Sequence, residues 1–151
     1  MGLFSRKPPP DLPQRDDLRR ALEAMHPKDA ERIRSKSYLV DACAAVPDTS
    51  TILAVLDAVI TEPHTTDRGL LCATAEAVTY QGDHSGRMTF PLPAVRRADV
   101  IARGTLRIEF DDTAPGVSAL PSREAADHLD FSVSAKPESV EFFMEQVRTS
   151  S

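Results

Sequence analysis

The fold is decided by the stretch Gly69-Leu70-Leu71-Cys72-Ala73-Thr74, which continues after Ala75-Glu76 as Ala77-Val78-Thr79-Tyr80-Gln81-Gly82. Two short runs of apolar and β-branched residues separated by two residues predict a β-hairpin. Residues 88–91 and 95–102 predict two further strands close behind it. Consecutive short strands with brief connections favour one antiparallel sheet.

Further strands are predicted on both sides of this stretch. Residues 105–110 and 129–133 alternate between apolar and polar side chains, which indicates half-buried strands. Residues 52–61 also fit a helical stripe, but their β-branched content and turn-rich flanks favour a strand. Residues 111–127 contain two prolines and a Pro-Gly pair and are interpreted as a long connection.

Helical periodicity marks three other segments. Residues 16–25 predict a short helix, and residues 27–46 predict a second one that begins at a proline and ends before another. Residues 137–148 predict a C-terminal amphipathic helix. The predicted buried stripes are Leu18, Ala21, Leu22 and Met25; Ala30, Ile33, Ser37, Val40 and Ala44; and Val140, Phe143, Met144 and Val147.

The length of 151 residues suits a single domain with an appendage. Residues 1–13 include the run Pro8-Pro9-Pro10 and cannot sustain a helix, because proline lacks the backbone donor. We therefore expect a mobile Pro-rich tail over residues 1–13, a helical segment over 14–49 and the main domain over 50–151.

Charge is unevenly distributed along the chain. Residues 1–36 carry nine Lys or Arg against six Asp or Glu, whereas residues 37–151 carry nine against seventeen. Affinity for nucleic acid depends on neutralising phosphates with basic side chains. The acidic main domain is therefore not expected to bind nucleic acid.

The residue types that carry chemistry are sparse. Cys43 and Cys72 lie far apart in no ligand-like spacing and are interpreted as core residues. The histidines show no metal-binding spacing, and no nucleophile–base pattern is present, so neither a metal, a cofactor nor an enzyme is predicted. The chain shows no membrane-spanning stretch and no signal-peptide core, which favours a cytoplasmic location.

The stretch from Gly69 to Tyr80, with its glycine, apolar pair, threonine, short turn and aromatic residue, resembles the bacterial pleckstrin-homology-like (PH-like) family. The segment Phe90-Pro91-Leu92, which leads into a strand, is similar to that family's Phe-Pro segment, and the closing helix is similar to its plug. The resemblance covers roughly residues 50–149. It implies a strongly bent antiparallel sheet or barrel of mainly β character, capped by the C-terminal helix and here preceded by two N-terminal helices.

Members of that family bind diverse partners, so the resemblance implies no particular ligand. The first inter-strand loop, predicted over residues 62–68, carries one arginine and two carboxylates, and a phosphoinositide site there is not expected. The candidate partner-binding surface is a sheet edge that could accept an added strand, together with Phe142, which lies off the buried stripe of the last helix, and the pair Arg96 and Arg97. Coverage of Phe142 by the N-terminal helices is the competing interpretation.

We expect a non-catalytic interaction module that binds a protein partner or associates with itself. The alternative is a peripheral membrane adaptor that uses the basic, amphipathic N-terminus. A competing interpretation is that the first helix docks on the main domain, since acidic residues dilute its charge. The candidate membrane-contact residues are Leu3, Phe4, Arg6, Lys7, Arg15 and Arg19.

Overall fold

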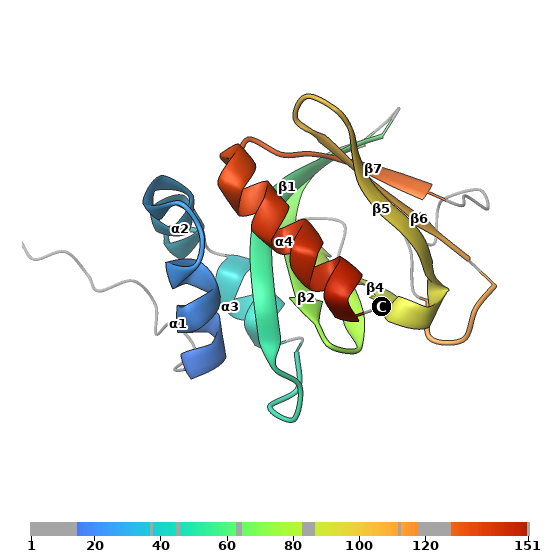
Figure 1. The fold of residues 1–151 in the computed structure, drawn as a ribbon, viewed down its shortest axis with the longest axis horizontal. Coiled ribbons are helices and arrows are strands. Elements are labelled where there is room, and N and C mark those ends of the chain that lie inside the picture. Colours follow the sequence, from blue (N-terminus) through green and yellow to red (C-terminus); the bar gives the residue numbers. More distant parts are fainter. Residues whose placement is uncertain are drawn as a thin grey trace, which may run out of the picture.

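The computed structural model describes residues 15–36, 38–44, 46–62, 65–82, 87–111, 113–117 and 128–150. These residues form an α+β fold of short N-terminal helices, a seven-stranded antiparallel sheet and a C-terminal helix (Figure 1). The helices are α1 (Asp16–Glu23), α2 (Pro27–Arg34), α3 (Tyr38–Ala44) and α4 (Pro137–Ser150), with one 3-10 turn, η1 (Leu92–Ala94). The strands are β1 (Ile52–Glu62), β2 (Thr65–Thr74), β3 (Ala77–Gly82), β4 (Arg87–Pro91), β5 (Val95–Ala102), β6 (Thr105–Phe110) and β7 (His128–Ser132).

The strand order is β4-β3-β2-β1-β7-β6-β5. The first and last strands are neighbours, since Val59 and Ile60 of β1 pair with Ser132 and Phe131 of β7. Among the described strands, β4 and β5 each have one neighbour, so the sheet is open at these two edges rather than closed into a barrel. The predicted antiparallel sheet is confirmed.

Every predicted strand is present, but the loop predicted over residues 62–68 is wrong. Strand β1 continues through Glu62 and β2 begins at Thr65, with pairing that runs without interruption from there to Gly69. Within this stretch Asp67 is buried, and its backbone carbonyl accepts a hydrogen bond from the Tyr80 hydroxyl at 3.2 Å. The residues at this end of β2 are polar, so the alternation of apolar side chains that indicates a strand is missing here.

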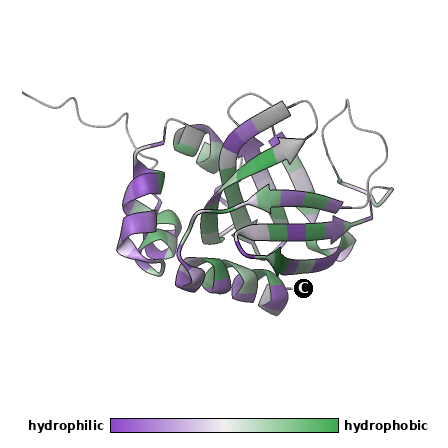
Figure 2. Cartoon of the chain, turned by 90° about the horizontal axis from the view of Figure 1, so that it is seen from above, coloured by the Kyte–Doolittle hydropathy of each residue, from purple (hydrophilic) through white to green (hydrophobic). Residues whose placement is uncertain are grey.

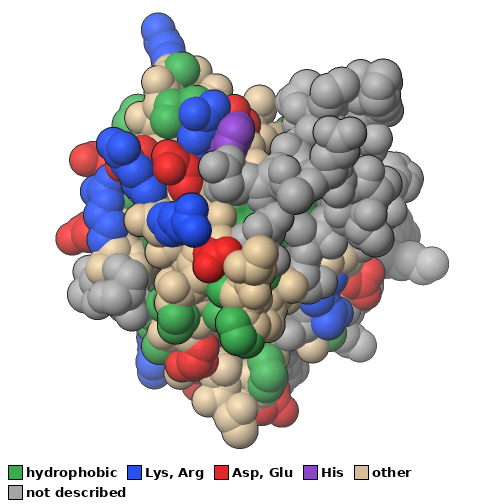
Figure 3. All heavy atoms as spheres, turned by 90° about the vertical axis from the view of Figure 1, so that its right-hand side faces the viewer, with side chains coloured by type: hydrophobic (Ala, Val, Ile, Leu, Met, Phe, Trp, Pro, Cys, Tyr) green, Lys and Arg blue, Asp and Glu red, His purple; other side chains and the backbone are tan. Residues whose placement is uncertain are grey.

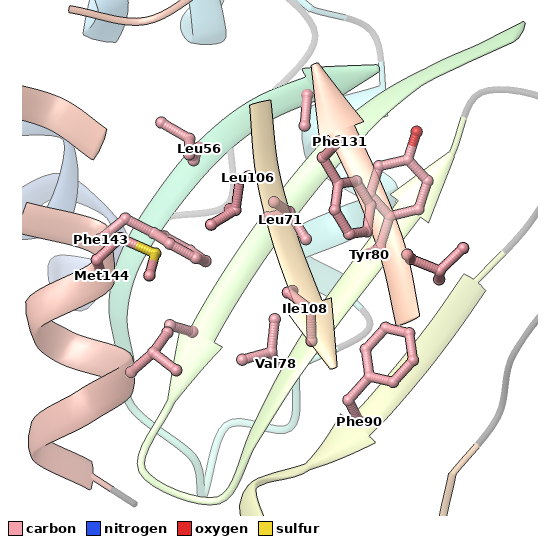
Figure 4. Close-up of a cluster of buried hydrophobic side chains, with 14 of the residues drawn as sticks. Leu56, Leu71, Val78, Tyr80, Phe90, Leu106, Ile108, Phe131, Phe143 and Met144 are labelled. Atoms are coloured by element: carbon pink, nitrogen blue, oxygen red, sulfur yellow. The ribbon is translucent and has the colours of Figure 1, made fainter. Parts of the chain in front are cut away.

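The larger hydrophobic core lies between one face of the sheet and α4. The predicted stripe of α4 is fully buried, and in Figure 4 Phe143 and Met144 project from the helix toward Leu56 and Leu106. The predicted inward residues of β6 and β7 are buried as well, which confirms the alternation assigned to both. These are Leu106, Ile108, Phe110, Leu129, Phe131 and Val133.

A second core lies on the opposite face of β1 and β2, where α1, α2 and α3 pack (Figure 1). The outward surfaces of these helices are hydrophilic and their apolar residues face the sheet (Figure 2). Ile52 and Val55 of β1 and Leu70 and Cys72 of β2 belong to this cluster. Because β1 is buried on both faces, it lacks the alternation of a half-exposed strand, which explains its ambiguous sequence.

The single helix predicted over residues 27–46 is wrong, because the chain forms α2 and α3 in its place, so three N-terminal helices are present rather than two. At the break the Ser35 hydroxyl donates to the Arg32 carbonyl at 2.6 Å, and the Lys36 amide bonds the Ile33 carbonyl three residues back. Serine competes for backbone groups in this way and favours helix ends. The buried face of α3 consequently differs from the predicted stripe, with Ala44 exposed and Leu39, Ala42 and Cys43 buried.

Arg15 joins the first helix to the end of the third. Its guanidinium donates to the carbonyl oxygens of Val46 and Ser50, each at 2.7 Å, and forms a 2.9 Å ion pair with Asp17. Burial raises the pKa of Asp17, but hydrogen bonds from Arg15 and from the Ile52 amide outweigh it and hold the pKa below its usual value. These contacts stabilise the N-terminal helices on the sheet. Docking of the first helix on the main domain is the interpretation of the sequence that competes with membrane contact.

A buried carboxylate joins α2 to the start of α4. Asp29 is 1% exposed and accepts hydrogen bonds from the Ser139 hydroxyl at 2.7 Å and the Lys136 amide at 2.9 Å. It also forms a 2.9 Å ion pair with Arg32. Burial raises the pKa of Asp29, but these hydrogen bonds outweigh it and leave the pKa below its ordinary value. Nothing in the periodicity of the sequence indicated this cluster.

Candidate functional site

An open groove of about 360 Å³ lies between the edge strand β5 and the C-terminal helix α4. Residues Val95 to Asp99 of β5 line it together with Val147 and Arg148 of α4. Strand β5 pairs with β6 alone among the described strands. All of its side chains are exposed or half-buried, so β5 lacks the alternation of buried and half-buried residues seen in β6. The groove therefore brings a sheet edge and a helix together at one accessible surface.

The groove is predominantly basic. Arg96, Arg97 and Arg148 line it together with one carboxylate, Asp99. Asp99 pairs with Arg97 and lies 3.4 Å from Arg148, whereas Arg96 lies 3.9 Å from Asp111 outside the groove. These arginines are about two-thirds exposed, at 62%, 69% and 62%, so such ion pairs contribute little to stability and leave the cations accessible.

Basic and acidic side chains are interspersed on the face that carries β5, β6 and β7 (Figure 3). Two apolar residues interrupt this polar surface at the far end of β5. Val100 and Ile101 are 49% and 47% exposed, and in the described part of the chain they are the large hydrophobic residues with exposed side chains. Exposed apolar side chains beside a polar rim are typical of interaction surfaces.

The predicted partner-binding residues have different positions. Arg96 and Arg97 both line the groove. Phe142 is half-buried and packs against the larger core, so it is not the exposed aromatic that the sequence suggested. Arg148 was missed as a groove residue, because only the docking of α4 beside β5 places it there.

Arg15 does not fit the membrane-contact prediction. Its side chain is 13% exposed and bonded to backbone carbonyls, as described above. Arg19 is 62% exposed and pairs with Asp16 at 3.1 Å. Leu3, Phe4, Arg6 and Lys7 lie outside the described residues, so their proposed role stays a prediction. In the described segments, no helix is both long enough and apolar enough to cross a membrane.

Both cysteine thiols are buried and free. Burial raises the pKa of Cys43 to about 11 and raises that of Cys72 still further. Because the thiolate is the reactive form, both cysteines are poor nucleophiles. His64, Asp83 and His84 lie outside the described residues. The described residues contain no group of three or more His, Cys, Asp or Glu side chains that could hold a metal ion.

Comparisons with known proteins indicate no function for this chain. No protein-family model matches the chain, and no curated protein matches its sequence. One weak structural neighbour is the C-terminal domain of an unknown protein from Leishmania infantum. It shares 11% identity at a TM-score of 0.48, over 78% of this chain and 97% of that one. Function must therefore be inferred from the site itself.

Proposed function

We propose that the protein is a non-catalytic interaction module of PH-like type that binds an extended, acidic segment of a partner protein along β5. The single observation that carries the proposal is the groove between β5 and α4, where a sheet edge lies beside accessible arginines. The antiparallel sheet followed by a helix packed on it supports the PH-like part of the proposal.

Strand addition is the binding mode that the edge supports best. An edge strand offers unpaired backbone N–H and C=O groups to an incoming strand, and pockets for alternate side chains give specificity. An incoming strand would lie beside β5 and place side chains into the groove against Val147. Val100 and Ile101 would supply apolar contacts at one end.

Charge complementarity argues for an acidic partner segment. Three arginines against one aspartate give the groove an excess of positive charge, although the whole chain carries a net charge of −5. Such an arrangement speeds association with an acidic segment and fixes its position more than it raises affinity. Charged residues on an edge strand also prevent edge-to-edge aggregation, and the experiment below separates that role from binding.

A synthetic peptide of alternating valine and glutamate, about as long as β5, tests the proposal by amide chemical-shift titration. We expect saturable shifts in β5 and α4, weakened roughly tenfold by Arg97→Glu, which reverses one charge in the groove. Arg87→Glu is the matched control, because Arg87 is an exposed arginine on the opposite edge strand β4.

Shifts that avoid β5, or equal loss in both variants, would refute binding at this groove. Self-association is tested on the same variants by size-exclusion chromatography with light scattering. A dimer that Arg97→Glu dissociates and Arg87→Glu does not would assign a second copy of the chain as the occupant in place of another protein.

A further inference from the structure

A second hollow, of about 180 Å³, lies where α2 approaches β1, β2 and β7. Its polar lining comes from segments that are far apart in the sequence. Arg32 and Lys36 lie in and just after α2, Asp57 and Arg68 lie on β1 and β2, and Ser132 and Ser134 lie at and beyond the end of β7. None of these residues lines the β5 groove.

The single carboxylate in the lining is neutralised from within. Asp57 accepts two hydrogen bonds from the Arg32 guanidinium, at 2.7 and 2.9 Å. Arg32 also pairs with the buried Asp29, and these contacts raise its pKa above the ordinary arginine value. This bidentate pair fixes the positions of Arg32 and Asp57 in the lining. Because the charge of Asp57 is balanced by Arg32, it repels an incoming anion only weakly.

The two other cations have no such compensation. Within the described part of the chain, the side chains of Lys36 and Arg68 form neither an ion pair nor a hydrogen bond. Both nevertheless line one small hollow, on a protein with a net charge of −5. Like charges that share a site repel each other, and an anion between them converts that repulsion into attraction.

We propose that this hollow binds the phosphate group of a small, soluble phosphate monoester. Lys36 and Arg68 supply the positive charge, and the hydroxyls of Ser132 and Ser134 add neutral donors for the remaining phosphate oxygens. The hollow, of about 180 Å³, has room for one phosphate group and a few attached atoms. This site is independent of the proposed partner groove.

Amide chemical-shift titration with inorganic phosphate and with glycerol phosphate tests the proposal, using sodium chloride at matched ionic strength as the reference. We expect both phosphates, and not chloride, to cause saturable shifts around residues 36, 68 and 132–134. Lys36→Gln and Arg68→Gln should each weaken binding roughly tenfold, since each removes one charge-assisted contact. The control is Arg34→Gln, an exposed arginine in the last turn of α2 that does not line the hollow.

The spectra also report whether each variant keeps the native fold, so a loss of binding is not confused with unfolding. Absence of saturable shifts in the natural protein, shifts that chloride reproduces, or equal weakening by Arg34→Gln would overturn the proposal. Vesicles of phosphatidylcholine with and without phosphatidic acid distinguish the source of the phosphate. Sedimentation with phosphatidic acid that needs Lys36 and Arg68, without binding of glycerol phosphate, would replace the soluble ligand with a lipid headgroup.

Discussion

Replacement of Asp29 by alanine should destabilise the protein more than any surface substitution. Asp29 is 1% exposed, and its removal leaves the Ser139 hydroxyl and the Lys136 amide without their acceptor. Arg32 keeps Asp57 as a partner, so one ion pair survives. Breaking a buried charged cluster costs about 3–5 kcal/mol, a large share of the roughly 5–15 kcal/mol that stabilises a typical domain.

Urea unfolding followed by far-UV circular dichroism measures this loss as a lower midpoint at unchanged slope. The matched control is Asp16→Ala, because Asp16 also pairs with an arginine three residues away but is 75% exposed. Its expected cost is at most about 0.5 kcal/mol. A loss below about 1 kcal/mol for Asp29→Ala, or losses of equal size in the two variants, would refute the assigned role of the cluster.

The same carboxylate makes stability depend on pH with a definite sign. The pKa of Asp29 is lowered by folding, so its contribution is fully present above the ordinary aspartate pKa of about 3.9. That contribution is lost as pH falls through the lower native pKa. The stability gap between the natural protein and Asp29→Asn should therefore stay constant from about pH 7 to 5 and narrow below about pH 4. A gap that does not narrow as the pH falls below about 4 would contradict a role for the ionised carboxylate.

Three further predictions concern single positions. Gly69→Ala should lower the free energy of unfolding in urea by about 2–3 kcal/mol. A Cβ at this position would lie 2.3 Å from the Gln81 backbone carbonyl and 2.5 Å from the Tyr80 ring. Unchanged stability would contradict this packing. Arg15→Met should cost about 2–3 kcal/mol, since it removes a charged donor from two partly buried carbonyls. Near-native stability would show that these contacts are dispensable. Cys43 and Cys72 should resist a thiol reagent such as Ellman's in the native protein and both react in urea, whereas rapid native labelling would mean that a thiol is accessible.

The strands that line one face of the sheet were readable from the sequence. In β6, for example, Leu106, Ile108 and Phe110 alternate with polar residues because one face is buried and the other is partly exposed. The same reasoning identified the buried stripe of α4, since residues three and four apart share a helix face. Both patterns are local, so the buried face of each element can be predicted without knowing which element packs against it.

The candidate sites were only partly readable. Arg96 and Arg97 were selected as a charged pair, and they do line the β5 groove. Phe142 was selected because it falls off the helical stripe, but it packs against the larger core and is half-buried. Arg68 was assigned to a loop, because a polar strand end shows no apolar alternation.

The sequence by itself determined most of the strand segments and which residues of α4 are buried. Only the tertiary structure decided that β1 lies beside β7, that Arg15 and Asp29 fasten the N-terminal helices, and that Lys36 shares a hollow with Arg68. The reason is physical. Burial periodicity is imposed residue by residue along the chain, whereas hydrogen bonds and charge clusters form between segments that docking alone brings together.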